Sequence, residues 1–339
     1  GDIMVNLYHD TTKSVNEELF NKFIVSYQKS RNIEFTSQQM KAVKGCITNK
    51  LNIICGYPGT GKTTITNAAC SYIKYVKSYY KICLTSHTGL ATTKLKDSID
   101  DNLYNTKLVG TITKLIYDVF PKIMYRYKDY VELAPDLIIV DEFSMVDMLL
   151  FNKLLNYCNY FSCDLIILGD NNQLPPIGSG NPLQTLIEAY EKYDLFNVEF
   201  LTTIKRQDGG ILRDVILKMD KTLITEKDFD EKTFCFIDEK QFIDKKTFDI
   251  DINKLKSYLT QEKIDIDKSH FLTPQKTKKF GWENMNKILQ NYFNPLSFEK
   301  NGTEKIRDPK KSKYKQIFHD GDKVMRTEND YSSDIIRAN

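Results

Sequence analysis

The stretch Leu51-Asn-Ile-Ile-Cys-Gly56-Tyr-Pro-Gly-Thr-Gly-Lys62-Thr63-Thr64 decides the fold class of this 339-residue chain. Its second part fits the pattern G-x-x-x-x-G-K-[ST] without a mismatch. The apolar run before the pattern predicts a strand, and Ala68, Ala69 and Ile73 after it predict a helix. A strand, a glycine-rich turn and a helix in this order are the context that a phosphate-binding loop requires.

The residues of this loop predict a site for ATP and Mg²⁺. Its glycines let backbone N–H groups converge on phosphates, and the helix N-terminus adds a partial positive charge. We expect Lys62 to reach the β- and γ-phosphates and the Thr63 hydroxyl to hold Mg²⁺. A glycine-rich turn with an incidental lysine is the alternative, and the flanking strand and helix argue against it. The predicted nucleotide-binding residues are Gly56, Tyr57, Pro58, Gly59, Thr60, Gly61, Lys62, Thr63 and Thr64.

Short β-branched runs alternate with helical stretches from Phe35 to Leu201. Strands that are apolar on both faces and separated by helices predict a parallel sheet covered by helices on both sides, an α/β fold. Before this region, apolar residues at helical spacing from Val15 to Tyr27 predict one helix. After it we expect strands at 270–273 and 323–326 and a helix around 282–292. The strands predicted for the main sheet are 51–55, 81–86, 137–141, 164–168 and 197–201.

Two adjacent carboxylates, Asp141 and Glu142, end the predicted strand 137–141. Ligands of open α/β sheets bind at the carboxyl ends of strands, so this pair is expected to face the same crevice as the phosphate loop. Asp141 would hold Mg²⁺ through water, and Glu142 would orient and deprotonate the attacking water. The pair could instead cap the next helix, but the phosphate loop favours hydrolysis.

The segment Gly169-Asp170-Asn-Asn-Gln173-Leu-Pro-Pro-Ile-Gly-Ser-Gly180 resembles motif III of the RecD-like branch of superfamily 1 helicases. The resemblance implies that Gln173 senses the γ-phosphate and passes its presence to a nucleic-acid groove. The alternative is a surface turn, which such a composition often forms. The family also implies a RecA-like fold for the sheet domain and the beginning of a second RecA-like domain after it.

Further segments resemble family motifs in the family's order. The segment 35–43 resembles the Q motif, in which Gln39 would read the adenine edge, although Thr36 and Gln39 also fit a capping box. The segments 86–91 and 110–115 resemble motifs Ia and Ib, which touch the nucleic-acid strand in the family. Thr113 stands where the family commonly has His, and His87 replaces a usual Pro. The implied nucleic-acid contacts here are His87, Thr88, Thr111 and Thr113.

Two regions towards the C-terminus also resemble the family. Arg206 stands where the family delivers an arginine to the γ-phosphate, although a solvated Lys-Arg pair remains the alternative. Thr273 and Asn286 resemble nucleic-acid-binding positions at the start of the second motor domain. The sequence ends before motifs V and VI, which leaves open whether this chain is active alone. The expected organisation is a helical extension at 1–34, a first motor domain at 35–208 with an insertion near 112–135, and a partial second motor domain at 209–339.

The resemblance implies an ATP-driven motor on single-stranded DNA, with RNA possible, and 5′-to-3′ travel as a DNA helicase in replication or repair. A nucleotide-binding scaffold or regulatory subunit, and a P-loop small-molecule kinase, are the alternatives. Aromatic and basic residues alternate at Tyr125, Arg126, Tyr127, Lys128 and Tyr130, which favours either a base-stacking patch or simple packing.

Charge, hydropathy and cysteine content indicate the kind of partner and the cellular compartment that we expect for the protein. The formal charge of +3 is nearly balanced, so a nucleic-acid surface must come from local clustering. No apolar run approaches the roughly 18–20 residues of a membrane span, so we expect no membrane association. The seven cysteines form no C-x-x-C pair. We expect buried free thiols in a reducing compartment, cytoplasmic or nuclear, and neither a zinc site nor disulfides.

Overall fold

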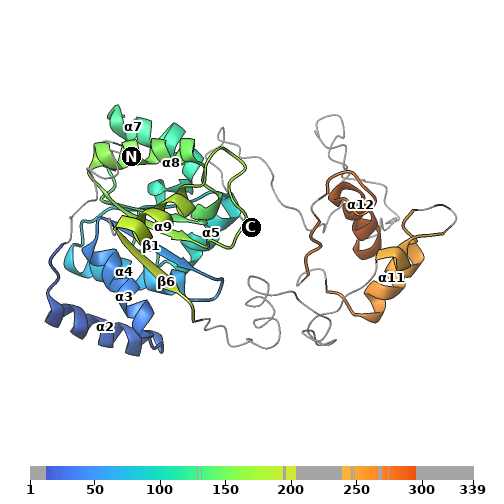
Figure 1. The fold of residues 1–339 in the computed structure, drawn as a ribbon, viewed down its shortest axis with the longest axis horizontal. Coiled ribbons are helices and arrows are strands. Elements are labelled where there is room, and N and C mark those ends of the chain that lie inside the picture. Colours follow the sequence, from blue (N-terminus) through green and yellow to red (C-terminus); the bar gives the residue numbers. More distant parts are fainter. Residues whose placement is uncertain are drawn as a thin grey trace, which may run out of the picture. The chain divides into compact units, whose positions relative to one another are not determined.

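A computed structural model describes residues 13–203, except 128, 131 and 194–195, and residues 239–294, except 246, 248, 266–268 and 274. The chain separates into two compact units, Gly1–Thr233 and Phe234–Asn339 (Figure 1). The first unit contains all the strands of the described ranges, and the second contains two helices and a short 3₁₀ turn.

Six parallel strands form the sheet of the first unit, in the order β3-β2-β4-β5-β1-β6. The predicted parallel sheet is therefore confirmed, with the predicted strands at or within one residue of their expected limits. The strand Val109–Thr111 was not predicted, because three residues with a central glycine carry almost no strand signal. The strands are β1 (Leu51–Gly56), β2 (Ile82–Ser86), β3 (Val109–Thr111), β4 (Leu137–Asp141), β5 (Asp164–Gly169) and β6 (Asn197–Leu201).

Helices cover both faces of this sheet, as Figure 1 shows for α7 and α8 on one side and α2, α3 and α4 on the other. Alternate strand residues supply two separate cores. Ile53 and Cys55 pack into the core under α8, whereas Ile54 packs into the core under α4. The first face carries α6 (Ile112–Lys114), a π-helical turn (Leu115–Val119), α7 (Phe120–Met124), α8 (Met148–Phe161) and α9 (Pro182–Tyr193), and the second carries α2 (Glu17–Arg31), α3 (Ser37–Thr48), α4 (Lys62–Val76) and α5 (Gly89–Ser98).

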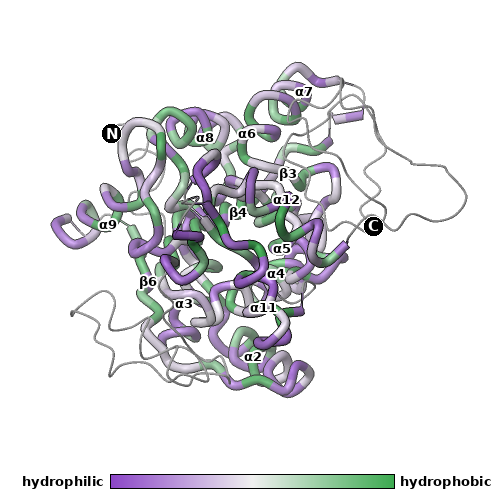
Figure 2. The backbone as a smooth tube through the Cα atoms, turned by 90° about the vertical axis from the view of Figure 1, so that its right-hand side faces the viewer, coloured by the Kyte–Doolittle hydropathy of each residue, from purple (hydrophilic) through white to green (hydrophobic). Residues whose placement is uncertain are grey.

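The central strands are buried on both faces, whereas the edge strands β3 and β6 are only partly buried. The helices alternate hydrophobic and hydrophilic stretches that can be followed in Figure 2. The strands β1, β2 and β5 are buried along their full length. A strand with apolar residues on both sides is stable only where helices remove both sides from water. The β-branched runs of the sequence therefore determine a central sheet, which fixes the position of the loops at its carboxyl edge.

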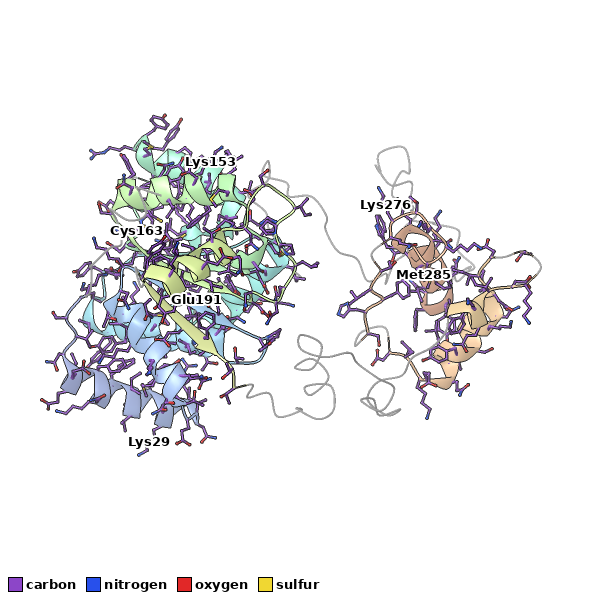
Figure 3. All side chains as sticks on the ribbon, in the orientation of Figure 1. Lys29, Lys153, Cys163, Glu191, Lys276 and Met285 are labelled. Carbon is purple, nitrogen blue, oxygen red and sulfur yellow. The ribbon has the colours of Figure 1, made fainter. Side chains whose placement is uncertain are left out.

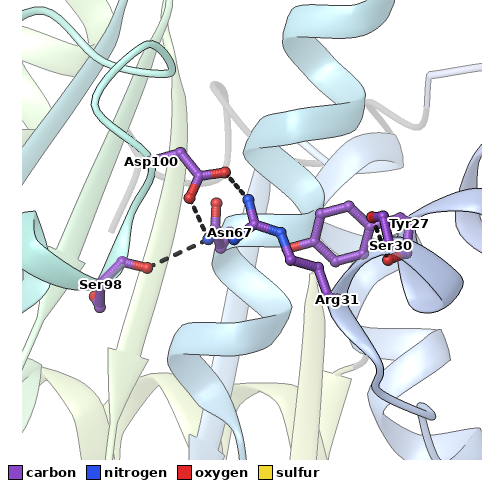
Figure 4. A network of polar contacts seen from close by, with 6 residues as sticks. All are labelled: Tyr27, Ser30, Arg31, Asn67, Ser98 and Asp100. Atoms are coloured by element: carbon purple, nitrogen blue, oxygen red, sulfur yellow. Dashed lines mark hydrogen bonds and ion pairs between the residues drawn. The ribbon is translucent and has the colours of Figure 1, made fainter.

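The predicted N-terminal helix is confirmed as α2, which starts at the N-cap Asn16 and ends at Asn32 in the left-handed conformation. Its Phe20 ring meets Tyr72 of α4 edge-on, with 5.3 Å between ring centroids. Figure 4 shows a polar network at the other end of the helix, where Arg31 pairs with Asp100. Asn67 of α4 donates to that carboxylate at 3.5 Å and to the Ser98 carbonyl at 3.3 Å (Figure 4). The network connects α2 to the helix that follows the phosphate loop.

The second unit has a small core of its own around Ile250, Leu255, Met285 and Ile288. Its elements are a 3₁₀ turn (Glu239–Phe242), α11 (Ile252–Gln261) and α12 (Trp282–Phe293), which confirms the helix predicted near 282–292. The strand predicted at 270–273 is wrong. Phe271 and Leu272 are exposed there and pair with no described strand, and a strand needs hydrogen bonds to a neighbour. The strand predicted at 323–326 lies outside the described residues.

Six of the seven cysteines are free and buried, as expected, and Cys235 lies outside the described ranges. Burial raises the pKa of the Cys46 and Cys55 thiols to about 12, so both stay protonated at neutral pH. In the described part of the chain, no helix is long and apolar enough to cross a bilayer.

Candidate nucleotide-binding site

The loop between β1 and α4 has the backbone of a phosphate cradle. Gly59 and Gly61 have φ angles of 83° and 91°, in the left-handed region that favours glycine. Helix α4 begins at Lys62 with Gly61 as its N-cap, and no side chain caps its first N–H groups. These N–H groups are therefore left for an anion at the helix N-terminus. Of the other predicted loop residues, Tyr57 and Thr63 are half-buried, Thr60 is buried, and Pro58 and Thr64 are exposed.

The Lys62 ammonium lies over this loop and among carboxylates. It donates to the carbonyl oxygens of Gly56 and Tyr57, the latter at 3.3 Å. Burial lowers the pKa of Lys62, whereas the charges of Asp170, Asp141 and Glu142 raise it. The three carboxylates that influence Lys62 come from the ends of two adjacent strands, β4 and β5. The sheet therefore gathers one cation and three anions at its carboxyl edge.

Asp141 is the last residue of β4 and Glu142 follows it, and β5 separates this strand from β1. Asp141 Oδ1 accepts from the backbone N–H of Glu142 at 2.9 Å. Burial raises the pKa of Asp141, and the nearby Glu142 charge raises it further. Glu142 has a φ of 52° and a ψ of 41°, a left-handed conformation that costs about 1–3 kcal/mol for a residue other than glycine. A buried carboxylate beside a strained residue is typical of a functional site rather than of a helix cap.

Unpaired polar atoms lie beside Asp141, at the end of β2. In the described ranges, Thr85 Oγ1, Ser86 Oγ and His87 Nδ1 are buried without a hydrogen-bond partner. Ser86 is the register neighbour of Asp141. Buried carboxylate and hydroxyl oxygens are ligands or water-binding groups that suit Mg²⁺. No group of three or more His, Cys, Asp or Glu side chains could hold a metal in the described part, so an ion here would need oxygens from phosphate and water as well.

Gln39 contacts the phosphate loop directly. Its side chain completes a capping box with Thr36 at the start of α3, and its Nε2 donates to the Thr60 carbonyl at 2.8 Å. A Cβ atom added to Gly61 would lie 2.6 Å from Gln39 Nε2, so the loop passes close against this side chain. Both polar atoms of the Gln39 amide are therefore engaged inside the protein, in the capping box and on the loop.

The segment after β5 reaches the site through its first residues. Asp170 is buried and its Oδ1 accepts from Asn172 N–H at 3.0 Å. Gln173 Oε1 accepts from the Ser144 hydroxyl at 3.3 Å, two residues beyond Glu142. A cavity of about 10 Å³, large enough for about one water molecule, lies beside these residues. Gln173 is thus held against the segment that carries Glu142.

Asp170 is a site residue that the sequence analysis did not single out. Its charge is the largest influence that raises the pKa of Lys62. The signal was present, because Asp170 directly follows a buried strand, as Asp141 does. What the sequence does not give is the strand order, which places β5 next to β1 and so brings Asp170 near Lys62.

The residues expected to touch nucleic acid are two threonines that cap helices, two residues beside them in the first unit, and two residues of the second unit. Thr88 and Thr111 use their hydroxyls as N-caps of α5 and α6, accepting from Ala91 and Lys114 N–H groups at 3.2 Å. Ser86 and Thr111 are register neighbours, which brings motifs Ia and Ib together beside half-buried His87 and exposed Thr113. Thr273 and exposed Asn286 belong to the second unit. Arg206 lies outside the described residues.

Comparisons with known proteins agree with the motifs. Residues 39–179 match a family model described as AAA domain. The chain is 31% identical over 224 residues to the RecBCD enzyme subunit RecD of Buchnera aphidicola, covering 60% of this chain and 36% of that protein. It is 24% identical over 309 residues to the ATP-dependent RecD2 DNA helicase of Deinococcus radiodurans, covering 89% of this chain and 37% of that protein.

Among solved structures, the Pif1 helicase of Candida albicans matches with a TM-score of 0.42 and 19% identity over 77% of this chain and 62% of that one. The chain spans little more than a third of the length of the RecD and RecD2 relatives. Its described sheet domain has an α/β RecA-like P-loop fold. Over the ranges that carry the ordered motifs, the chain is thus similar to RecD and RecD2 proteins.

Proposed function

We propose that the protein is an ATP-dependent motor on single-stranded nucleic acid, and specifically a DNA helicase that travels 5′ to 3′. The observation that carries the proposal is the convergence of Lys62, Asp141, Glu142 and Asp170 at the edge of the sheet that also holds the glycine loop. A phosphate cradle alone serves many nucleotide-binding proteins. A cradle that faces the half-buried carboxylates Asp141 and Glu142 and the buried carboxylate Asp170 supports hydrolysis.

Each residue has a defined task in this proposal. Lys62 would exchange the loop carbonyls for phosphate oxygens, and the N-terminal N–H groups of α4 would bind the remaining phosphate charge. Thr63 and Asp141 would hold Mg²⁺, whose charge offsets that of the triphosphate. Glu142 would accept the proton of the attacking water. Gln173, bonded to Ser144 of the same segment, would respond to the terminal phosphate.

The relatives support the nucleic-acid part of the proposal. One carries the name ATP-dependent RecD2 DNA helicase, and another is a subunit of the RecBCD enzyme. Motifs Ia and Ib lie side by side at the same edge of the sheet as the phosphate loop. We extend the proposal to a partial second RecA-like domain at 209–339 and, within the first motor domain, to Arg206 as a contact of the γ-phosphate. A reducing location, cytoplasmic or nuclear, is supported by the six free thiols of the described ranges.

The test is ATP hydrolysis by the full chain with and without a single-stranded oligothymidylate. Hydrolysis should rise when DNA is added. Lys62→Ala should reduce the rate by at least about 100-fold, because it removes a charge that stabilises the transition state. Lys96→Ala on the exposed face of α5 is the matched lysine control and should behave as wild type.

Two results would overturn the proposal. Nucleotide binding without DNA-stimulated hydrolysis would favour a scaffold or regulatory subunit. Transfer of phosphate to an added metabolite would favour a small-molecule kinase. Polarity is tested separately, by unwinding duplexes that carry a single-stranded tail at the 5′ or the 3′ end. The proposed direction requires that only the 5′-tailed duplex is opened.

A further inference from the structure

A groove of about 520 Å³ lies between α8 and the helical turns of residues 112–124. Three tyrosines line it, Tyr117, Tyr157 and Tyr160, together with Lys153, whose position on α8 is labelled in Figure 3. Its other lining residues are Ile116, Pro121, Met124, Asn156 and Asn159. This volume is within the range of about 300–1,000 Å³ that ligand pockets usually have.

The groove is separate from the nucleotide site. Helix α8 begins just after Glu142, at the carboxyl edge of the sheet, and ends at Phe161, just before β5 starts at Asp164. The lining residues of α8 run from Lys153 to Tyr160, the half that leads away from the carboxyl edge. A ligand in this groove would therefore lie towards the opposite edge of the sheet from Lys62.

Two of the three groove tyrosines are presented to solvent, whereas Tyr157 is half-buried and packs against the core. Tyr117 is 56% exposed and Tyr160 is 55% exposed, although large aromatic rings usually pack inside. Tyr125 and Tyr127, which follow the groove residue Met124, are also exposed. Tyr130 instead packs against the core, and the Lys122 ammonium lies 5.4 Å from the centre of the Tyr130 ring. Of the predicted aromatic patch, the described structure thus leaves Tyr125 and Tyr127 on the surface and uses Tyr130 for packing.

Lys153 is the charged residue among those that line the groove, and the segments that form the groove carry more positive than negative charges. The segments 112–127 and 148–161 contain Lys114, Lys122, Arg126 and Lys153 but only one acidic residue, Asp118. Asp118 pairs with Lys122 at 2.8 Å. The Lys153 ammonium lies 4.4 Å from the Tyr117 ring centre and donates to its hydroxyl at 2.6 Å. A cation is therefore held at the centre of an aromatic surface.

We propose that this groove binds a second stretch of single-stranded nucleic acid, outside the motor's own track. Bases would stack on Tyr117 and Tyr160, and Lys153 would contact a phosphate. Single-strand binding surfaces combine a cationic groove with aromatic rings, because every base has a face that can stack. The two asparagines offer donors and acceptors to base edges without fixing a sequence. The inference rests on the proposed function, since it supposes that the protein acts on such strands.

The experiment compares the binding of two fluorescent oligothymidylates, of about 10 and about 30 nucleotides, to the full chain. The shorter one can fill one site, and the longer one can reach both. Tyr160→Ala and Tyr117→Ala should each weaken binding of the longer strand by about fivefold or more, the loss of one base stack, and leave the shorter strand unaffected. Tyr160→Phe should bind as wild type, because the ring remains.

The control is Tyr79→Ala, which removes a still more exposed tyrosine from the loop between α4 and β2 and should change neither affinity. Lys153→Gln should reduce the slope of log affinity against log salt by about 0.7 for the longer strand, the value expected for one phosphate contact. Unchanged melting temperatures would show that the variants are folded. Photo-crosslinks from bromodeoxyuridine in the longer strand should map to segments 112–127 and 148–161.

Unchanged affinity of the longer strand in both tyrosine variants, or crosslinks confined to other segments, would overturn the groove as a nucleic-acid site. A groove that instead takes a peptide of a partner protein would give that same result. Such an outcome leaves the motor intact if wild-type hydrolysis is still stimulated by DNA. If wild type binds neither strand and shows no stimulation, the proposed function fails together with the groove.

Discussion

Two loops leave neighbouring strands at the carboxyl edge of the sheet and are built in opposite ways. The loop after β1 is held on several sides, by Gln39 on the Thr60 carbonyl, by the Thr60 hydroxyl on Tyr57, and by Lys62 on the loop carbonyls. The segment after β5 is anchored at its start, yet its middle is on the surface. There Leu174 is 81% exposed and Ile177 is fully exposed.

The two loops differ in how far the domain itself fixes their conformation: the loop after β1 is held by internal hydrogen bonds, and the segment after β5 exposes apolar side chains to solvent. A phosphate site gains from a backbone that is already in its bound conformation, because no ordering cost remains at binding. Leu174 and Ile177 place two large apolar side chains close together on the surface, where contiguous apolar patches mark contact regions. The first loop is therefore already arranged as a phosphate cradle. For the second loop, the proposed function implies a contact surface that responds to Gln173.

The largest expected effect lies at Glu142, which follows β4, the neighbour of β5 on the side away from β1. Glu142→Gln should lower the hydrolysis rate by about 10²–10⁴-fold, because it removes the proposed proton acceptor, and should leave nucleotide binding intact. Glu142→Gly should lose the same activity but gain roughly 0.4–1 kcal/mol or more in unfolding free energy, since it relieves the left-handed backbone strain. Single-turnover hydrolysis and thermal unfolding measure the two effects. A Gln variant that hydrolyses ATP at the wild-type rate would remove Glu142 from the mechanism.

The next effect concerns the support of the first loop. Gln39→Ala removes half of the capping box and the bond to Thr60, and should lower the unfolding free energy by about 1–2 kcal/mol. It should weaken ATP and GTP binding by the same factor, because both nucleotides need the same loop. The neighbouring Gln38, which bonds Thr202 instead, provides the control Gln38→Ala. Weaker ATP binding with unchanged GTP binding would show instead that Gln39 reads adenine.

The smallest effect is expected at the second loop. Ile177→Ser should change the unfolding free energy by less than about 0.5 kcal/mol, because the side chain is fully exposed. The buried counterpart Ile53→Val should cost about 0.5–1.5 kcal/mol although it removes only one methylene. Ile177→Ser should reduce the stimulation of hydrolysis by DNA. Destabilisation as large as that of Ile53→Val would mean that the loop packs in solution.

The contrast also explains which features could be predicted from sequence. Strands β1, β4 and β5 consist mostly of apolar residues, which predicts the sheet. The glycine-lysine pattern after β1 is specific to phosphate loops, which predicts the cradle. Both features therefore follow from local residues. The proximity of Asp170 to Lys62 depends on strand order, which no local pattern encodes. The second engagement of Gln39, on Thr60, likewise depends on how α3 packs beside the loop. The Phe271–Leu272 run failed as a strand because an apolar composition does not by itself supply a neighbouring strand to pair with.

The most direct measurement is a crystal structure of the protein with Mg²⁺ and a nonhydrolysable ATP analogue. The account predicts that the Lys62 ammonium leaves the Gly56 and Tyr57 carbonyls for the β- and γ-phosphates, with the metal between Thr63 and Asp141. An analogue bound elsewhere, with Lys62 still on those carbonyls, would contradict it.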